Sequence, residues 1–348
     1  MSSTSDAPLS VSVRIRYADA KALAALVAEA EDLGLDGVWV NEPWGFDAGA
    51  VLGWVAASTR RMWLGTHVLS IYARTPAATA GLAAALHSLS EGRFRLGLGT
   101  SGPQVVEGWH GVPFDRPLAR TRDTVEIVRR ALSGEPVSHD GDVVTLPLPD
   151  SRGRALRFSQ LGEPMHVPIY LGALGPKNQQ LTAELADGWT PTPYSPDSHS
   201  AFAGDLEAAL DRTHRRADVR LAPVVPVAVG DDVNALLDLE RRWSAFYLGG
   251  MGSKEQNFYA AAARRTGHGP MVDRITERWQ AGDRRGAKAA VTDEYADSVG
   301  LYGPPERIAE RADRYRAAGI DELVIELRKP DLGDQLDDLR LFWKALTS

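Results

Sequence analysis

Short apolar runs alternate along the chain with segments whose apolar residues recur every three or four positions. Val11, Val13 and Ile15 alternate with polar residues as in a β-strand. Apolar residues then follow at helical spacing over 23–33, and Gly34 marks the end of the predicted helix. The same alternation continues to the end of the chain, and it is typical of βαβ units around a parallel sheet.

Eight segments carry a strand pattern, and a helical pattern separates most of them. The predicted strands are 11–15, 38–40, 62–71, 93–99, 167–171, 188–190, 219–229 and 323–327. The predicted helices are 23–33, 48–58, 75–89, 117–132, 177–186, 200–215, 231–247, 304–318 and 332–346. Eight such units predict an α/β fold of the TIM (β/α)₈ barrel type, with one domain over 11–348 after a flexible tail, 1–10.

Two segments interrupt this alternation and are interpreted as insertions. Residues 134–166 are rich in glycine and proline, with a turn at Gly141 between β-type residues, and predict a hairpin with a loop. Residues 249–298 predict a second, mostly helical insertion. Both are long enough to act as lids over a site, and both are equally compatible with dimer contacts or surface decoration.

In barrels of this kind the chemistry lies at the carboxyl ends of the strands. The residues found there are Asn41, Glu42 and Trp44, then 67–72, 100–110 and 172–177. The turn 172–177 places two glycines and Lys177 at the start of a helix, where free N–H groups and the helix dipole favour an anion. It predicts a phosphate site, or else an ordinary turn with Pro176 at the first helical position.

Several ionisable side chains in these loops have two interpretations. Glu42 is a general acid, a ligand to a cofactor hydroxyl group, or one more loop carboxylate. His67 lies among apolar strand residues, where a histidine is either functional or a satisfied core residue. Glu107 and His110, with Trp109 between them, line a pocket or pack their loop against the barrel.

Two patterns in this region resemble known functional motifs but lack part of the sequence context that those motifs require. Gly97, Gly99 and Gly102 satisfy the Gly-x-Gly-x-x-Gly pattern of dinucleotide-binding proteins, but the glycines and prolines that follow allow at most one or two helical turns. Ser101 lacks the second glycine of a hydrolase nucleophile elbow, because Pro103 stands there. A Rossmann-type nicotinamide site and a serine hydrolase are therefore disfavoured.

Composition restricts the possible chemistry further. The 348 residues include no cysteine, and the eight histidines are scattered without a ligand cluster, so any redox chemistry needs an organic cofactor and no protein-held metal is expected. A net charge of −7 disfavours a nucleic-acid partner. No apolar run is long enough to span a membrane, and the first residues lack an export signal, so we expect a cytoplasmic protein with a small-molecule substrate.

Five segments of this chain, taken together, resemble the luciferase-like monooxygenase superfamily in its deazaflavin-dependent branch. The first is GLGTSGPQVVEGWHGVPF over 97–114. The others are VWVNEPW over 38–44, LGTHV over 64–68 with ARTP over 73–76, the stretch 168–189 ending in ADGW, and GGMGS over 249–253. The resemblance covers nearly the whole chain in the expected order.

This resemblance implies a luciferase-type barrel that binds coenzyme F420, with FMN as the alternative, and that commonly forms a homodimer. It implies a cis peptide bond between His67 and Val68 beside the cofactor ring, and phosphate binding at Gly172 to Gly175. The implied cofactor-binding residues are Glu42, His67, Val68, Thr100, Ser101, Gly102, Gly172, Ala173, Leu174, Gly175 and Lys177.

One departure from the family pattern bears on the reaction. The sugar-phosphate dehydrogenases of the family have a catalytic histidine and a catalytic glutamate where this chain has Pro43 and Gly102. We therefore expect a reductase that transfers a hydride from reduced F420 to an activated C=C or C=N bond of a small molecule or a modified peptide, such as one containing a dehydroamino acid. The candidate catalytic residues are Glu42, His67, Tyr72, Glu107 and His110, with water as a further proton donor. A flavin monooxygenase of the same fold and a non-catalytic cofactor-binding barrel are the alternatives.

Overall fold

The fold is seen in a computed structural model that describes residues 9–16, 19–252 and 257–347. Most of the predicted tail, residues 1–10, lies outside the described part of the chain. Ser10 is an exception, because it already belongs to the first strand and pairs with Glu322.

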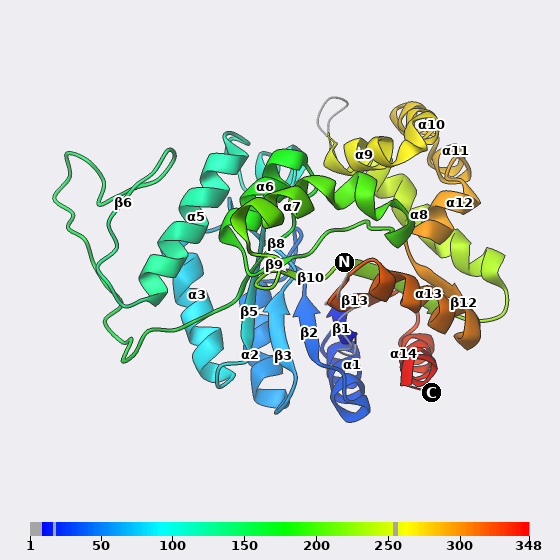
Figure 1. Cartoon of the computed structure of the whole chain (residues 1–348), viewed down its shortest axis with the longest axis horizontal. Helices are drawn as coiled ribbons and strands as arrows, with labels where there is room; N and C mark the ends of the chain where they lie inside the picture. The colour runs from blue at the N-terminus through cyan, green and yellow to red at the C-terminus, as the bar shows by residue number, and fades with distance from the viewer. Residues whose placement is uncertain (1–8, 17–18, 253–256, 348) are drawn as a thin grey trace.

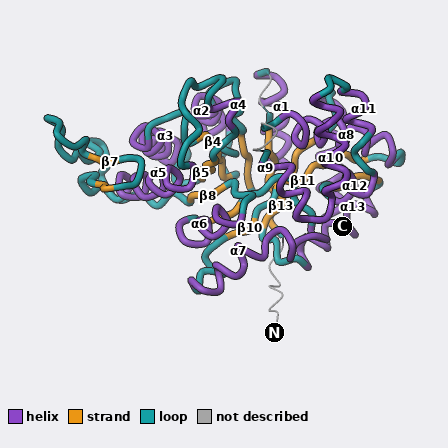
Figure 2. The backbone as a smooth tube through the Cα atoms, turned by 90° about the horizontal axis from the view of Figure 1, so that it is seen from above, coloured by secondary structure: helices purple, strands orange, loops and turns teal. Residues whose placement is uncertain are grey.

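Parallel strands form a closed ring, as the alternating pattern predicts. Its strands are β1 (Ser10–Ile15), β2 (Gly37–Val40), β3 (Trp63–Thr66), β5 (Phe94–Gly99), β8 (Ile169–Leu171), β9 (Gly188–Trp189), β10 (Arg220–Leu221), β11 (Val224–Val229) and β13 (Glu322–Leu327). The successive segments β10 and β11 close the ring, because β10 pairs with β9 while β11 pairs with β13. Figure 2 shows the strands in the middle of the molecule with helices around them.

Three details of the sheet differ from the sequence-based prediction. The predicted strand 62–71 is divided into β3 and β4 (Leu69–Ser70) by a cis peptide bond between His67 and Val68. The predicted strand 219–229 is divided into β10 and β11, which pair with different neighbours. An additional strand, β12 (Leu301–Gly303), pairs with the edge of β11 opposite to β13 and is too short to give a recognisable alternating pattern.

Helices surround the barrel close to the predicted ranges. They are α1 (Ala20–Leu33), α2 (Ala48–Ser58), α3 (Pro76–Leu89), α5 (Pro117–Leu132), α6 (Pro176–Leu185), α7 (His199–Thr213), α13 (Pro305–Ala317) and α14 (Leu332–Thr347). Asp19 caps the start of α1 through its side chain, and Gly34 ends the helix with a φ of 90°. After β5 the chain forms only the single turn α4 (Pro103–Val106), so the predicted early break is confirmed.

The first insertion contains the predicted hairpin, formed by β6 (His139–Asp140) and β7 (Thr145–Leu146). It projects away from the barrel at the left of Figure 1. Asp123 of α5 fastens it, because this buried carboxylate accepts hydrogen bonds from the backbone N–H groups of Val143 (2.7 Å) and Val144 (2.8 Å).

The second insertion is helical, as predicted, although residues 253–256 lie outside the description. It extends α8 (Val233–Gly250) and continues through α9 (Phe258–Ala263), a π-helical turn (Arg264–His268), α10 (Gly269–Gln280), α11 (Arg284–Ala289) and α12 (Asp293–Ser298). These helices form a separate apolar core and lie together at the upper right of Figure 1. Gly249 and Gly250 let α8 pack closely on Trp279, because an added Cβ would lie only 2.8 and 2.6 Å from its ring.

None of the described helices is both long and apolar enough to cross a lipid bilayer.

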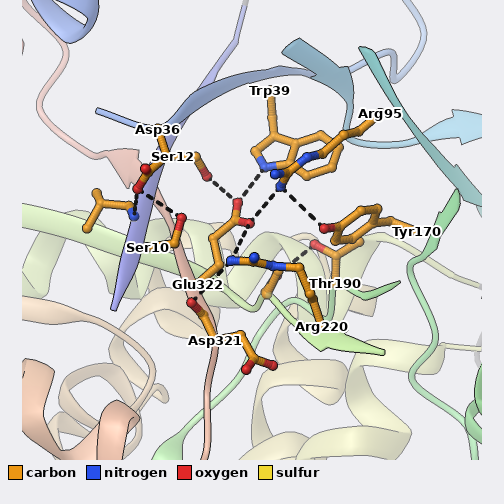
Figure 3. Close-up of polar contacts among 12 residues, drawn as sticks. Ser10, Ser12, Asp36, Trp39, Arg95, Tyr170, Thr190, Arg220, Asp321 and Glu322 are labelled. Atoms are coloured by element: carbon orange, nitrogen blue, oxygen red, sulfur yellow. Dashed lines mark hydrogen bonds and ion pairs between the residues drawn. The ribbon is translucent and has the colours of Figure 1, made fainter. Parts of the chain in front are cut away.

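The amino-terminal end of the barrel is held by a fully buried carboxylate, Glu322, at the first residue of β13 (Figure 3). Its Oε1 accepts hydrogen bonds from Ser12 Oγ (2.6 Å) and Trp39 Nε1 (3.2 Å), and its Oε2 accepts one from Arg95 Nη1 (3.1 Å). Three donors from three strands thus satisfy one buried charge, as its burial requires. The sequence pattern missed this group, because the predicted strand began one residue later.

Candidate active site

A cavity of about 1390 Å³ opens at the carboxyl ends of the strands. Its wall is built from the residues that follow β1, β2, β3, β5, β8 and β9, together with residues of α8 to α11. This is the end of the barrel where the sequence predicted the site. Because the helices of the second insertion form part of the wall, that insertion is a structural component of the cavity.

His67 is held at the cavity wall by two partners. Arg14 Nη1 lies 3.4 Å from His67 Nδ1, and His67 Nε2 lies 2.5 Å from Thr190 Oγ1. A guanidinium only donates, so Nδ1 is the acceptor and Nε2 carries the hydrogen. Thr190 in turn donates to the carbonyl oxygen of Ala222 (2.8 Å). The ring is therefore fixed in one tautomer.

Burial lowers the pKa of His67 from 6.5 to about 4. The unfolded chain consequently binds more protons than the folded one between these two values, and the free energy of unfolding falls as the pH drops from about 6.5 to 4. We expect His67→Gln to make this fall shallower by at most about 1.4 kcal/mol per pH unit. Urea unfolding at several pH values measures it, with the exposed His166→Gln as control. Equal slopes for the wild type and His67→Gln would contradict the assigned burial effect.

Val68, on the other side of the cis bond, explains the glycine pattern of β5. A Cβ at Gly99 would lie 2.6 Å from Val68 Cγ2, and one at Gly97 would lie 2.0 Å from the Thr66 carbonyl oxygen. These glycines therefore let β5 pass close to the chain on either side of the cis bond. The first two glycines of the Gly-x-Gly-x-x-Gly pattern therefore allow β5 to pack closely against this segment.

Glu42 lines the cavity and is tied to Arg74. Both oxygens of its carboxylate accept hydrogen bonds from the Arg74 guanidinium, and Oε2 also accepts one from the Ala48 backbone (2.7 Å). The Arg74 guanidinium also donates a hydrogen bond to the Asp47 carboxylate. Glu42 is thus positioned as a paired carboxylate that can accept a hydrogen bond from a ligand hydroxyl group.

The predicted anion-binding turn is placed at the cavity wall. Gly175 precedes α6 without any side-chain cap, Pro176 occupies the first turn, and that turn contains no acidic residue. Lys177 makes no hydrogen bond or ion pair with any other residue that the structure describes. Of the implied phosphate-binding residues, Gly172, Leu174, Gly175 and Lys177 line the cavity, whereas Ala173 is buried behind it and binds Trp189 through its carbonyl oxygen (2.8 Å).

The structure separates the remaining candidate residues into two groups. Thr100, Ser101 and Gly102 line the cavity beside His67 and Val68. Tyr72, Glu107 and His110 are not part of the lining.

Each of these last three side chains is engaged or enclosed elsewhere. Tyr72 donates to the Asp115 carbonyl oxygen (2.7 Å), and burial raises its pKa. Glu107 accepts from the backbone of Phe114 (3.1 Å). His110 Nε2 is buried without a partner among the described residues.

Sequence reasoning missed the basic and aromatic side chains of the opposite wall. Arg14 and Arg16 come from the end of β1, and Trp243 and Trp279 come from α8 and α10. The alternation of Arg14 and Arg16 with apolar residues was a usable signal for the first pair, because a charged residue on an inner strand position needs a partner or a ligand. No comparable signal marks the second pair.

The sequence model of the luciferase-like monooxygenase family matches residues 3–322, which is most of the chain. The chain belongs to this family. Within this luciferase-like barrel the implied cis peptide bond is present between His67 and Val68. The described residues contain no cluster of three or more side chains suited to hold a metal ion.

Several relatives of this luciferase-like protein are named as oxidoreductases or reductases, some of them with F420 in the name. A Mycobacterium tuberculosis protein that is named as a coenzyme F420-dependent oxidoreductase is 40% identical over 310 residues, covering 87% of this chain and 89% of the relative. The 5,10-methylenetetrahydromethanopterin reductase of Archaeoglobus fulgidus is 28% identical, over 85% of this chain and 86% of its own. The solved F420-dependent tetrahydromethanopterin reductase of Methanopyrus kandleri superposes with a TM-score of 0.81 at 22% identity, over 98% and 99% of the two chains, and shows the shared fold.

Proposed function

We propose that this protein is an F420-dependent oxidoreductase that works as a reductase on an activated C=C or C=N bond of a small molecule or a modified peptide. The observation that carries the proposal is the cavity itself. It combines the His67–Val68 cis bond with an uncapped, cationic helix start at Gly175 and Lys177. Relatives whose names include F420 support the choice of cofactor.

The residues present fit this cofactor. The uncapped first turn of α6 with Lys177 offers N–H donors and a positive charge to a phosphate group. Glu42 offers carboxylate oxygens to cofactor hydroxyl groups, and His67, Val68 and Thr100 to Gly102 provide the surface for its ring. When bound there, reduced F420 supplies a hydride to one carbon of the acceptor and is itself oxidised, and a proton completes the reduction at the neighbouring atom.

The side chains of the site are suited to positioning more than to proton donation. His67 is neutral, with both ring nitrogens engaged, and Glu42 is tied to a guanidinium. The proton therefore comes from water that enters through the open mouth or from a group of the substrate. Rate acceleration then rests on holding the acceptor about 3 to 3.5 Å from the hydride donor.

An anaerobic turnover assay tests this function. Reduced F420 is mixed with the protein and with a panel of conjugated acids, enones and imines, and the oxidation of F420 is followed. We expect protein-dependent oxidation with at least one acceptor and no requirement for oxygen. A reaction that proceeds only in air, with peroxide or an oxygenated product, would overturn the reductase assignment.

We also propose that the enzyme is a cytoplasmic homodimer. The projecting first insertion exposes the apolar side chains of Leu148 (69%) and Leu156 (67%), and a contact with a second copy would remove both from water. Sedimentation equilibrium tests the dimer, and a monomer at micromolar concentration would overturn it.

A further inference from the structure

The cavity is basic although the chain is acidic. The net charge of the chain is −7, yet the described residues that line the cavity include seven basic side chains and one carboxylate, Glu42. Arg74 already pairs with that carboxylate. The lining therefore favours anionic ligands.

These basic residues lie in two regions of the ring. Lys177 belongs to the turn after β8, whereas Arg16 follows β1. In the strand order of the barrel, β1 is four strands away from β8 in one direction and five in the other, with β10 and β11 counted separately. Arg16 therefore belongs to the wall opposite the proposed phosphate turn. Trp243 of α8 packs on Arg16, and α11 packs on α8, so the basic residues of these two helices are assigned to the same wall.

That opposite wall is also aromatic. Trp243 and Tyr247 of α8 have ring centroids 6.2 Å apart, and Phe246 packs edge-on against Trp279 of α10 at 5.9 Å. The guanidinium of Arg16 lies 4.1 Å from the centre of the Trp243 ring, and that of Arg284 lies 3.7 Å from the centre of the Trp279 ring. Flat rings and planar cations therefore alternate along this surface.

Two cations of this wall lack an anionic partner among the described residues. Arg242 and Arg285 make no hydrogen bond or ion pair with another residue in the described part of the chain, although Arg285 lies close enough to Asp283 to influence it electrostatically. Lys288, by contrast, is paired with Asp238. Arg242 and Arg285 are thus available to bind a carboxylate, for which the guanidinium is well shaped.

We propose that the wall formed by Arg242, Arg285, Trp243 and Trp279 binds the hydride acceptor, and that this acceptor is an aromatic or conjugated carboxylic acid. The inference rests on the proposed function, because it assigns the opposite wall to the cofactor. The volume of about 1390 Å³ supports it, since single ligand pockets usually measure about 300 to 1,000 Å³ and this cavity has room for a second molecule. The carboxylate binds the two arginines, and the conjugated part lies against the surface that the indole rings form together with the guanidinium groups of Arg16 and Arg284.

Calorimetric titration with cinnamate and with its neutral amide, cinnamamide, tests the proposal. On the F420-loaded protein we expect the acid to bind at least about tenfold more tightly than the amide, as one charge-assisted hydrogen-bonded pair provides. In the double variant Arg242→Gln/Arg285→Gln the two affinities should become equal, while F420 binding stays unchanged. Arg274→Gln, at an exposed arginine of α10 outside the cavity, is the matched control.

Two results would overturn the inference. One is equal affinity of the wild type for the acid and the amide, or no detectable binding of either. The other is a loss of F420 affinity in the double variant, because the arginines would then belong to the cofactor site. A failure of the wild type to bind F420 would instead refute the proposed function, and the same titrations without F420 would still decide whether the wall recognises a carboxylate.

Discussion

Replacing Glu322 by alanine is expected to lower the free energy of unfolding by about 3 to 5 kcal/mol. The substitution removes the anion that pairs with Arg95 and leaves the donors of Ser12 and Trp39 without their acceptor at a fully buried position. Breaking one half of a buried ion pair is costly because the other half stays desolvated. Equilibrium unfolding in urea measures the loss.

Two comparisons make this prediction specific. Glu322→Gln keeps an acceptor oxygen and should cost less than Glu322→Ala. The exposed Glu163→Ala should change stability by no more than about 0.5 kcal/mol. Because Glu322 lies at the end of the barrel opposite the cavity, the folded variant should keep its F420 affinity. A stability loss below about 1 kcal/mol would show that the network in Figure 3 does not hold the barrel.

The second large effect is expected from Gly99→Ala. The added Cβ would lie 2.6 Å from Val68 Cγ2, so either β5 or the cis-bonded segment must move. Overpacking of this kind typically costs about 1 to 3 kcal/mol, and here it also displaces the surface assigned to the cofactor ring. We therefore expect both lower stability and F420 binding weakened by at least about tenfold.

A double variant distinguishes this clash from other causes. Val68→Ala removes the methyl group that meets the new Cβ, so Gly99→Ala/Val68→Ala should recover most of the stability that the single variant loses. Gly53→Ala is the control for a glycine replacement, because no atom lies within 4 Å of its added Cβ, and it should stabilise α2 by about 0.5 to 1 kcal/mol. Strict additivity of the Gly99 and Val68 changes would contradict the contact.

The barrel could be predicted because its pattern is local. Strand alternation and helical spacing are visible within single units, as at Val11 to Ile15 and at the helix ending in Gly34, and the structure follows them closely. The turn at Gly175 could be predicted for the same reason, since its glycine, proline and lysine are consecutive. The division of β10 from β11 could not, because it depends on which neighbour each half pairs with.

The parts of the site that escaped prediction join residues that are distant in the sequence. Arg14 and Thr190 meet at His67 only because distant strands converge there, and Arg16 meets Trp243 of α8 from a distant part of the sequence. Glu107 was a candidate because it lies in the loop after the predicted strand 93–99, but its carboxylate bonds Phe114 and does not line the cavity. Residues that are close together in the sequence therefore predict a local turn more reliably than they predict which side chains share a site.

An anaerobic equilibrium titration with F420 and, separately, with FMN tests the proposed cofactor most directly. The protein's tryptophan fluorescence is followed for the wild type, for Lys177→Gln in the proposed phosphate turn, and for the control Lys21→Gln on the exposed start of α1. We predict micromolar or tighter F420 binding, roughly tenfold weaker binding in Lys177→Gln only, and no comparable affinity for FMN. Tighter binding of FMN than of F420 would contradict the assignment.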